Sequence, residues 1–191
     1  MERRAREAFG WLATCFTMIS YISPIIPFIN LFKKKIPYED TPALMITANY
    51  INCLCWYVYG EMIYSNQIQK CNLIGAISSL SLIFIYLFYE IKKYALDAIL
   101  NTLLIITGTY SIYRGFTLII DDDGIIGKIC IGTSFLVFWF PIQIIYKAMK
   151  EKNYNLILIC PTWGALAANI FWSIYGIFLT DINIICHILL H

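Results

Sequence analysis

Long apolar stretches separated by short charged ones are the dominant pattern of this chain. A bilayer core about 30 Å thick is crossed by about 20 helical residues, with a range of about 17–25, and most of the stretches approach or exceed that length. Their apolar runs are continuous rather than alternating, which favours helices over the strands of a barrel. The pattern predicts an all-α polytopic membrane protein. The stretches without Asp, Glu, Lys or Arg are 8–32, 41–60, 71–89, 98–113, 129–146 and 153–180.

Two segments depart from the length that a bilayer crossing needs. The fourth stretch is short, but it can continue to Ile120 if the side chain of Arg114 faces protein or snorkels to the interface. Only residues 182–191 follow Asp181, and a helix of that length rises about 15 Å, half of a bilayer core. We therefore expect seven helices, the last of them short and truncated.

Composition supports a membrane protein and excludes other classes. Of the 191 residues, 60% are hydrophobic and 14% are charged, whereas a soluble domain is about a quarter charged. With a net charge of +2 and no basic face, a nucleic-acid partner is not expected. The lipid bilayer is the expected partner, and the sequence leaves a homo-oligomer open.

Basic residues are unevenly distributed between the loops. Lysines concentrate at 33–35, 92–93 and 147–152, and the loops between these hold the acidic run 121–123. The positive-inside rule places the lysine-rich loops in the cytosol and the amino terminus outside. Three arginines near the amino terminus argue against this orientation.

The two halves of the chain carry the same motifs at a nearly constant offset. Residues 56–60 and 172–176 both read W-x-x-Y-G, at an offset of 116, and Pro24 and Pro141 each precede a lysine-rich loop, at an offset of 117. Such self-similarity predicts a repeat architecture. One extra crossing between two three-helix repeats gives both the same orientation, a known transporter plan with the substrate near the midplane. The expected parts are a bundle at 1–94, a linker transmembrane helix at 95–122 and a second bundle at 123–191.

Proline and glycine mark positions where the bundles can bend or turn. A proline in a helix interior removes one hydrogen bond and kinks the helix, which membrane helices tolerate. The W-x-x-Y-G glycines, Gly60 and Gly176, are expected to end the second helices and let the chain turn. The candidate hinges are Pro24, Pro42, Pro141 and Pro161.

The motifs occur in the same order in both halves. Ser23-Pro24, Asn52-Cys53, W-x-x-Y-G at 56–60 and Asn72-Leu73-Ile74-Gly75 lie in the first half, and Pro141 with Gln143 and W-x-x-Y-G at 172–176 lie in the second. Together they resemble the SWEET (MtN3/saliva) sugar transporters of the PQ-loop superfamily, over about residues 9–91 and 130–188. The resemblance implies two three-helix bundles joined by an inversion linker helix. It also implies facilitated diffusion of mono- or disaccharides without ion coupling.

The resemblance further implies which residues line a sugar site. In that family each bundle contributes a Trp from its second helix and an Asn from its third, and the matching positions here are Trp56, Trp172 and Asn72. The second Asn is expected where Ile188 stands, and the fourth proline is expected near residue 158 but occurs at 161. A Trp face suits the C–H side of a sugar, and an Asn can both donate to and accept from its hydroxyls.

These residues also have purely structural interpretations. Trp56 and Trp172 can be interface-belt aromatics, and Asn72 can bond between helices, as we also expect of Asn52. The seven cysteines lie within or beside apolar stretches and are interpreted as small buried hydrophobic residues. No disulfide, metal, cofactor or catalytic cluster is indicated by their spacing, so we do not expect an enzyme.

Several functions remain open at this point. The first is a bidirectional, facilitative sugar uniporter working by alternating access. The alternatives are a PQ-loop-type transporter of another small solute, a cargo receptor that does not transport, and an inactive paralogue that acts as a partner subunit. A multi-pass protein of the plasma membrane is favoured over one of the Golgi or another endomembrane.

Overall fold

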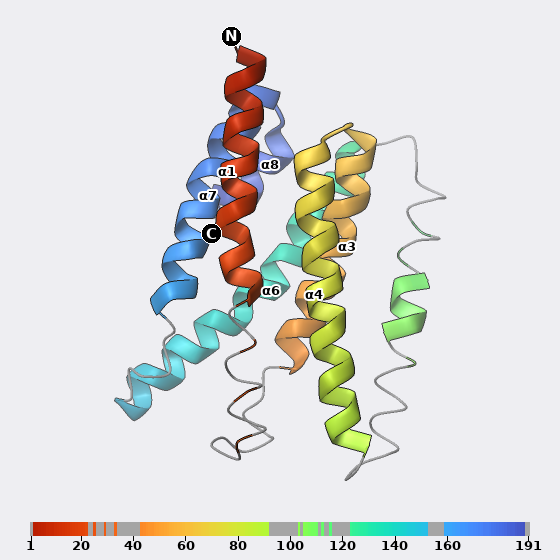
Figure 1. Cartoon of the computed structure of the whole chain (residues 1–191), viewed down its shortest axis with the longest axis vertical. Coiled ribbons are helices and arrows are strands. Elements are labelled where there is room, and N and C mark those ends of the chain that lie inside the picture. The colour runs from red at the N-terminus through yellow and green to blue at the C-terminus, as the bar shows by residue number, and fades with distance from the viewer. Residues whose placement is uncertain are drawn as a thin grey trace.

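A computed structural model of the chain describes residues 2–22, 25, 29, 33, 43–91, 103, 105–110, 112, 115, 123–152 and 159–189, some of them by backbone alone. Within these residues there is no strand, and the all-α prediction is confirmed. The labelled helices, shown in Figure 1, are α1 (Glu2–Ile22), α3 (Ala43–Met62), α4 (Asn66–Ile91), α6 (Asp123–Glu151), α7 (Ile159–Leu179) and α8 (Ile182–Leu189).

The two halves pack against each other crosswise. Helices α3 and α4 form a hairpin in the first half, and α8 folds back against α7 and α6 in the second. Helix α1 packs mainly along α7, while α3 packs along α6. The first helix of each half therefore lies against the second helix of the other half, and all the labelled helices surround one centre.

The turns after α3 and α7 have the same backbone structure. Tyr64 and Thr180 both have a φ of 54°, and the next amide donates to the carbonyl of Gly60 in the first half and of Gly176 in the second, at 2.8 and 3.1 Å. The expectation that the glycines themselves make the turn is wrong, since no described glycine has a positive φ.

Close packing explains the W-x-x-Y-G glycines instead. A Cβ atom added at Gly60 would lie 2.9 Å from Cγ2 of Ile68, and one added at Gly176 would lie 2.9 Å from Cγ2 of Ile184. Both isoleucines belong to the helix that follows the turn. The glycines thus let the second and third helices of each half approach closely, which side chains at these positions would prevent.

The segment between the halves packs on the first half. Residues 105–110 are helical, and Thr109 Oγ1 lies 3.3 Å from the hydroxyl of Tyr50 on α3. Ile105 packs on the buried cluster of α3 and α4 that includes Ile46 and Leu82. A helix does lie in the predicted linker, whereas the boundaries at 94 and 122 stay predictions.

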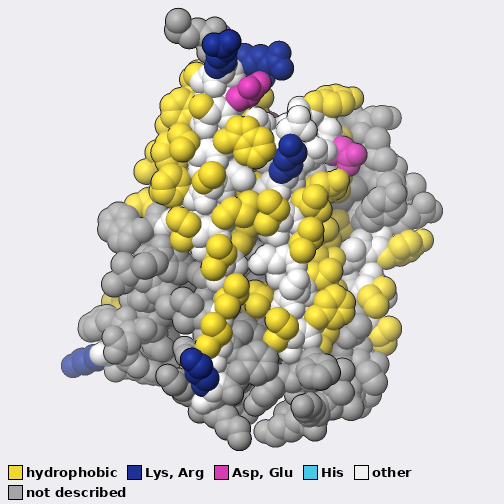
Figure 2. Space-filling model, in the orientation of Figure 1, with side chains coloured by type: hydrophobic (Ala, Val, Ile, Leu, Met, Phe, Trp, Pro, Cys, Tyr) yellow, Lys and Arg dark blue, Asp and Glu magenta, His cyan; other side chains and the backbone are white. Residues whose placement is uncertain are grey.

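The surface suits a lipid environment. Among the described residues, Asn66–Leu87 is long and apolar enough to cross a membrane unaided, and Gly124–Phe135 and Gly164–Leu179 are shorter apolar helical segments. Exposed apolar side chains cover much of the face in Figure 2, while charged side chains gather mainly near its upper end. So continuous an apolar surface is unusual on a soluble monomer.

Candidate functional site

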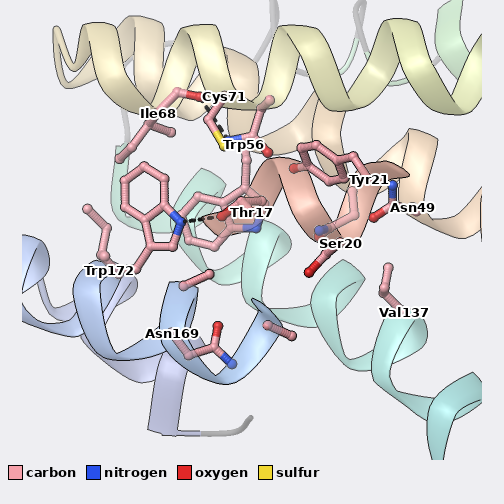
Figure 3. Close-up of a pocket in the computed structure, with 15 residues that line it drawn as sticks. Thr17, Ser20, Tyr21, Asn49, Trp56, Ile68, Cys71, Val137, Asn169 and Trp172 are labelled. Atoms are coloured by element: carbon pink, nitrogen blue, oxygen red, sulfur yellow. Dashed lines mark hydrogen bonds between the residues drawn. The ribbon is translucent and has the colours of Figure 1, made fainter. Parts of the chain in front are cut away.

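A central cavity of about 170 Å³ lies between the two halves and is lined by residues from all the labelled helices (Figure 3). Its described wall contains two tryptophans, four asparagines and Tyr21, together with small and aliphatic side chains. Among the lining residues that the structure describes, none is Asp, Glu, Lys, Arg or His. The cavity therefore offers aromatic faces and neutral hydrogen-bonding groups.

The two tryptophans of the W-x-x-Y-G motifs both line this cavity, Trp56 from α3 and Trp172 from α7. Each ring stands edge-on to the tyrosine of its own motif. The centroid distance and interplanar angle are 5.4 Å and 89° for Trp56–Tyr59, and 5.5 Å and 82° for Trp172–Tyr175. Such T-shaped pairs are a favoured aromatic geometry, so each motif holds its indole in the same way.

The indole N–H groups bond across the boundary between the halves. Trp56 Nε1 donates to Ser134 Oγ on α6 at 3.1 Å, and Trp172 Nε1 donates to Thr17 Oγ1 on α1 at 3.0 Å. These partners occupy the N–H groups, so that the aromatic faces are what a ligand can contact. This position favours a cavity role over the interface-belt interpretation for both tryptophans, and their part in sugar binding stays a prediction.

Asn72 of α4 lines the same cavity. Its Nδ2 donates to the carbonyl of Ile68 in its own helix at 2.9 Å, and its Oδ1 has no hydrogen-bonding partner among the described residues. The buried amide therefore has acceptor capacity that a ligand hydroxyl can satisfy. The interhelical interpretation of Asn72 is not supported, because its hydrogen bond is made within one helix.

Three further asparagines, Asn49, Asn52 and Asn169, line the cavity and were not assigned to a site from the sequence. Asn52 also joins helices as expected, because its Oδ1 lies 2.9 Å from the hydroxyls of both Thr133 and Ser134 of α6, either of which can donate to it. Helical spacing could have indicated all three, since Asn49 and Asn52 precede Trp56 by seven and four residues and Asn169 precedes Trp172 by three.

The two motif tyrosines lie against the cavity tryptophans and bond crosswise between the halves. Tyr59 of the first half donates to Asp181 Oδ2 at 2.7 Å and accepts from Asn183 Nδ2 at 3.1 Å. Asp181 and Asn183 lie where α8 begins, in the second half. This tyrosine is only 1% exposed, so the contact joins the two halves in the interior of the protein.

Tyr175 of the second half makes the corresponding contact with residues of the first half. Its hydroxyl lies 2.7 Å from Ser65 Oγ and donates to Gln67 Oε1 at 3.2 Å, where α4 begins in the first half. Ser65 and Gln67 correspond to Asp181 and Asn183 at the repeat offset of 116. We call these six side chains the tyrosine layer: Tyr59, Ser65, Gln67, Tyr175, Asp181 and Asn183.

The candidate hinges are only partly described. Pro141 lies within α6, and Pro161 is the third residue of the described α7, a first-turn position that proline occupies at little cost. Pro24, Pro42 and the side chain of Ile188 lie outside the described residues. Their predicted roles stay predictions.

The described cysteines are unpaired. Cys53, Cys55, Cys71 and Cys130 are buried, which confirms the structural interpretation for these four, whereas Cys15 is exposed on α1 and that interpretation is wrong there. An apolar stretch of a membrane helix has an outward face as well as a buried one, so position within the stretch did not decide burial. Among the described residues no group of three or more His, Cys, Asp or Glu could hold a metal ion.

Comparison with known proteins supports the architecture. A family model described as "Sugar efflux transporter for intercellular exchange" matches residues 7–94 and 124–190. The 3.7 Å structure of a eukaryotic SWEET transporter superposes with a TM-score of 0.84 over 99% of this chain and 93% of that one, at 18% identity. That likeness establishes the fold, in which two parallel three-helix bundles are joined by a linker helix.

Curated relatives include bidirectional sugar transporters of plants. SWEET13 of Oryza sativa subsp. japonica is 23% identical over 91% of this chain and 60% of its own length. SWEET3 of Arabidopsis thaliana is 21% identical over 95% of this chain and 72% of its own length. The chain thus spans about 60% of the rice relative. The family consists of membrane transport proteins rather than enzymes, and the match over most of its length shows that this chain belongs to the SWEET (MtN3/saliva) family.

Proposed function

We propose that this protein is a facilitative, bidirectional sugar uniporter that works by alternating access. The observation that supports this most strongly is that Trp56, Trp172 and Asn72, drawn from both halves, line one central cavity. Two aromatic faces can contact the C–H surfaces of a sugar ring, while the asparagine amides bond its hydroxyls.

The neutral wall of the cavity favours this proposal over the alternatives. A proton-coupled carrier of another solute needs an ionisable group in the pathway, and a receptor for charged cargo needs a charged pocket, whereas the described lining residues carry no charge. The cavity, about 170 Å³, is below the roughly 300–1,000 Å³ of pockets for drug-sized ligands. We therefore propose a monosaccharide as the preferred substrate.

The tyrosine layer suggests how alternating access works. We propose that it closes one side of the cavity in this state, so that transport to that side requires the two crossed contacts to open together. By the distribution of lysines, this side faces away from the cytosol. The four prolines remain candidate hinges for the movement, and the plasma membrane remains the proposed location.

The experiment is a labelled-sugar uptake panel in a cell that lacks its own sugar carriers, with and without a pH gradient. We expect saturable uptake that does not depend on the gradient, and its loss in Trp56→Ala and Asn72→Ala with membrane insertion intact. Trp139→Ala and Asn66→Ala are matched controls, because both side chains are exposed and outside the cavity. Uptake unaffected by the first two changes would contradict the proposed site, and uptake only with a gradient would favour a coupled transporter.

A further inference from the structure

Two hydroxyl groups outside the W-x-x-Y-G motifs hold the cavity tryptophans. Thr17 in α1 and Ser134 in α6 differ by 117 positions, the same offset that relates Pro24 and Pro141. Each accepts the indole N–H of a tryptophan that belongs to the other half, Trp172 for Thr17 and Trp56 for Ser134. The same kind of hydrogen bond therefore occurs twice, and each time it joins one half to the other.

The local geometry of the two hydroxyls is also the same. Thr17 Oγ1 lies 2.8 Å from the carbonyl oxygen of Ala13, and Ser134 Oγ lies 2.8 Å from that of Cys130, in each case four residues earlier in its own helix. A hydroxyl has one proton to donate and two lone pairs that accept. Donation to the Ala13 carbonyl fixes the rotation of the Thr17 hydroxyl and directs a lone pair to the indole, which has only a donor. The Ser134 proton has two acceptors within reach, the Cys130 carbonyl and Asn52 Oδ1, and donation to either one leaves a lone pair for the indole.

We propose that Thr17 and Ser134 are positioning residues that set the orientation of the two cavity tryptophans from the opposite half of the molecule. This inference deepens the proposed transport function and rests on it. Each indole is attached by its backbone to one half and by its N–H to the other. Movement of the halves must therefore rotate the ring or break the bond, so that the aromatic faces are presented correctly only in certain states.

The two connections are unequal. Next to Ser134, Asn52 supplies a second link between α3 and α6 through Thr133 and Ser134. The position that corresponds to Asn52 at the repeat offset is Ala168, whose side chain cannot form a hydrogen bond. Trp56 is also 5% exposed, while Trp172 is only half-buried. Loss of the Thr17 hydroxyl should therefore disturb Trp172 more than loss of the Ser134 hydroxyl disturbs Trp56.

The test compares Thr17→Val, which keeps the shape and removes the hydroxyl, with the rescuing variant Thr17→Ser. Thr14→Val is the matched control, because Thr14 is buried one turn away and its Oγ1 also donates to its own helix, at 2.9 Å from the Gly10 carbonyl. Protein labelled with 5-fluorotryptophan gives one ¹⁹F resonance per indole, and the one missing in Trp172→Phe identifies Trp172. Uptake of D-glucose, D-fructose and sucrose into vesicles gives the second readout.

We expect Thr17→Val to shift the Trp172 resonance and to raise the half-saturating concentration of the transported sugar about threefold to tenfold, the effect of losing one hydrogen bond. Thr17→Ser and Thr14→Val should leave both near the wild-type values. A Trp172 resonance in Thr17→Val that matches Thr14→Val would overturn the inference.

The two proposals fail separately. If wild-type vesicles take up none of the sugars but the resonance moves as expected, the positioning role stands and the transport function does not. If Thr17→Val does not fold, Ser134→Ala decides the question through the Trp56 resonance. Its control is Ser173→Ala, because the Ser173 hydroxyl also bonds its own helix. An unmoved Trp56 resonance would then contradict the inference.

Discussion

The two halves of this molecule share the same aromatic and backbone contacts, but they do not contribute the same polar groups to the cavity. Both have a tryptophan edge-on to a tyrosine, an indole bonded to a hydroxyl of the other half, and a turn closed by a left-handed residue. Among the described lining residues, however, the first half contributes Asn49, Asn52 and Asn72, whereas the second half contributes one asparagine, Asn169. The two tryptophan faces are thus symmetric, and the asparagine amides are not.

This difference indicates that the repeat sets the positions of the helices around the cavity. The residues at individual positions then decide which chemical groups of a ligand the cavity can bind. The residue that matches Asn52 is Ala168, and the one that matches Asn72 is Ile188. A sugar between the two indoles would therefore direct most of its hydroxyls toward the first half. The predictions below test the contrast between the halves, beginning with the largest expected effect.

Removal of the tryptophans should affect stability unequally. Trp56 is buried and joins two helices, so Trp56→Ala should cost about 3–5 kcal/mol of stability, as for other large-to-small core changes. Trp172→Ala should cost less, because this side chain is half-buried. Thermal unfolding in detergent checks the order, and a larger loss for Trp172→Ala would contradict the contrast. Both variants should lose sugar uptake.

Removal of the hydroxyl groups of Tyr59 and Tyr175 should also have unequal effects on stability. Tyr59 bonds the carboxylate of Asp181, whereas Tyr175 bonds neutral partners, and bonds to charged groups are the stronger ones. We expect Tyr59→Phe to cost about 1–3 kcal/mol and Tyr175→Phe about 0.5–1.5 kcal/mol. Unfolding midpoints measure the difference, with Tyr146→Phe as the control because that side chain is exposed. Equal shifts in all three variants would exclude a stabilising role for the tyrosine layer.

Gly10 in α1 should affect stability, because it packs against two side chains of the tyrosine layer. A Cβ atom at Gly10 would lie 2.8 Å from Gln67 Cγ and from Tyr175 Cε2, while one at Gly132 meets nothing within 4 Å. Gly10→Ala should therefore destabilise the protein by about 1–2 kcal/mol through overpacking, despite the better helix propensity of alanine. Gly132→Ala should be neutral or stabilising. A stabilised Gly10→Ala variant would show that α1 and α7 can separate at no cost.

The smallest effect is expected from Asn52→Ala. The Ser134 hydroxyl can still bond the carbonyl of Cys130, so the loss should be about 0.5–1.5 kcal/mol. If Asn52 supports Trp56, Asn52→Ala should make the two halves more alike. In the Asn52→Ala protein, the shift of the Trp56 resonance caused by Ser134→Ala should become as large as the shift of the Trp172 resonance caused by Thr17→Val. Unchanged sensitivity would show that Trp56 is held by packing alone.

The helices could largely be predicted from the sequence, because a charge-free stretch of bilayer length has few alternatives to a helix. Their ends could not: α1 begins at Glu2, within the charged segment that precedes the first apolar stretch, since a helix can continue into polar surroundings. The resemblance pointed to Trp56, Trp172 and Asn72, which the structure brings to one cavity, while their role in binding stays a prediction. It could not reveal Thr17 or Ser134, because their bonds join residues that lie 155 and 78 positions from their partners. Those contacts depend on the crossed packing of the halves.

The central claim is that the cavity between the halves carries a neutral sugar across the bilayer. Counterflow of a radiolabelled monosaccharide in proteoliposomes preloaded with the unlabelled sugar tests this most directly. We predict saturable exchange in both directions that is unaffected by a pH gradient, retained in Trp139→Ala and lost in Trp56→Ala. Exchange no faster than in protein-free liposomes, or equal exchange in both tryptophan variants, would contradict the account.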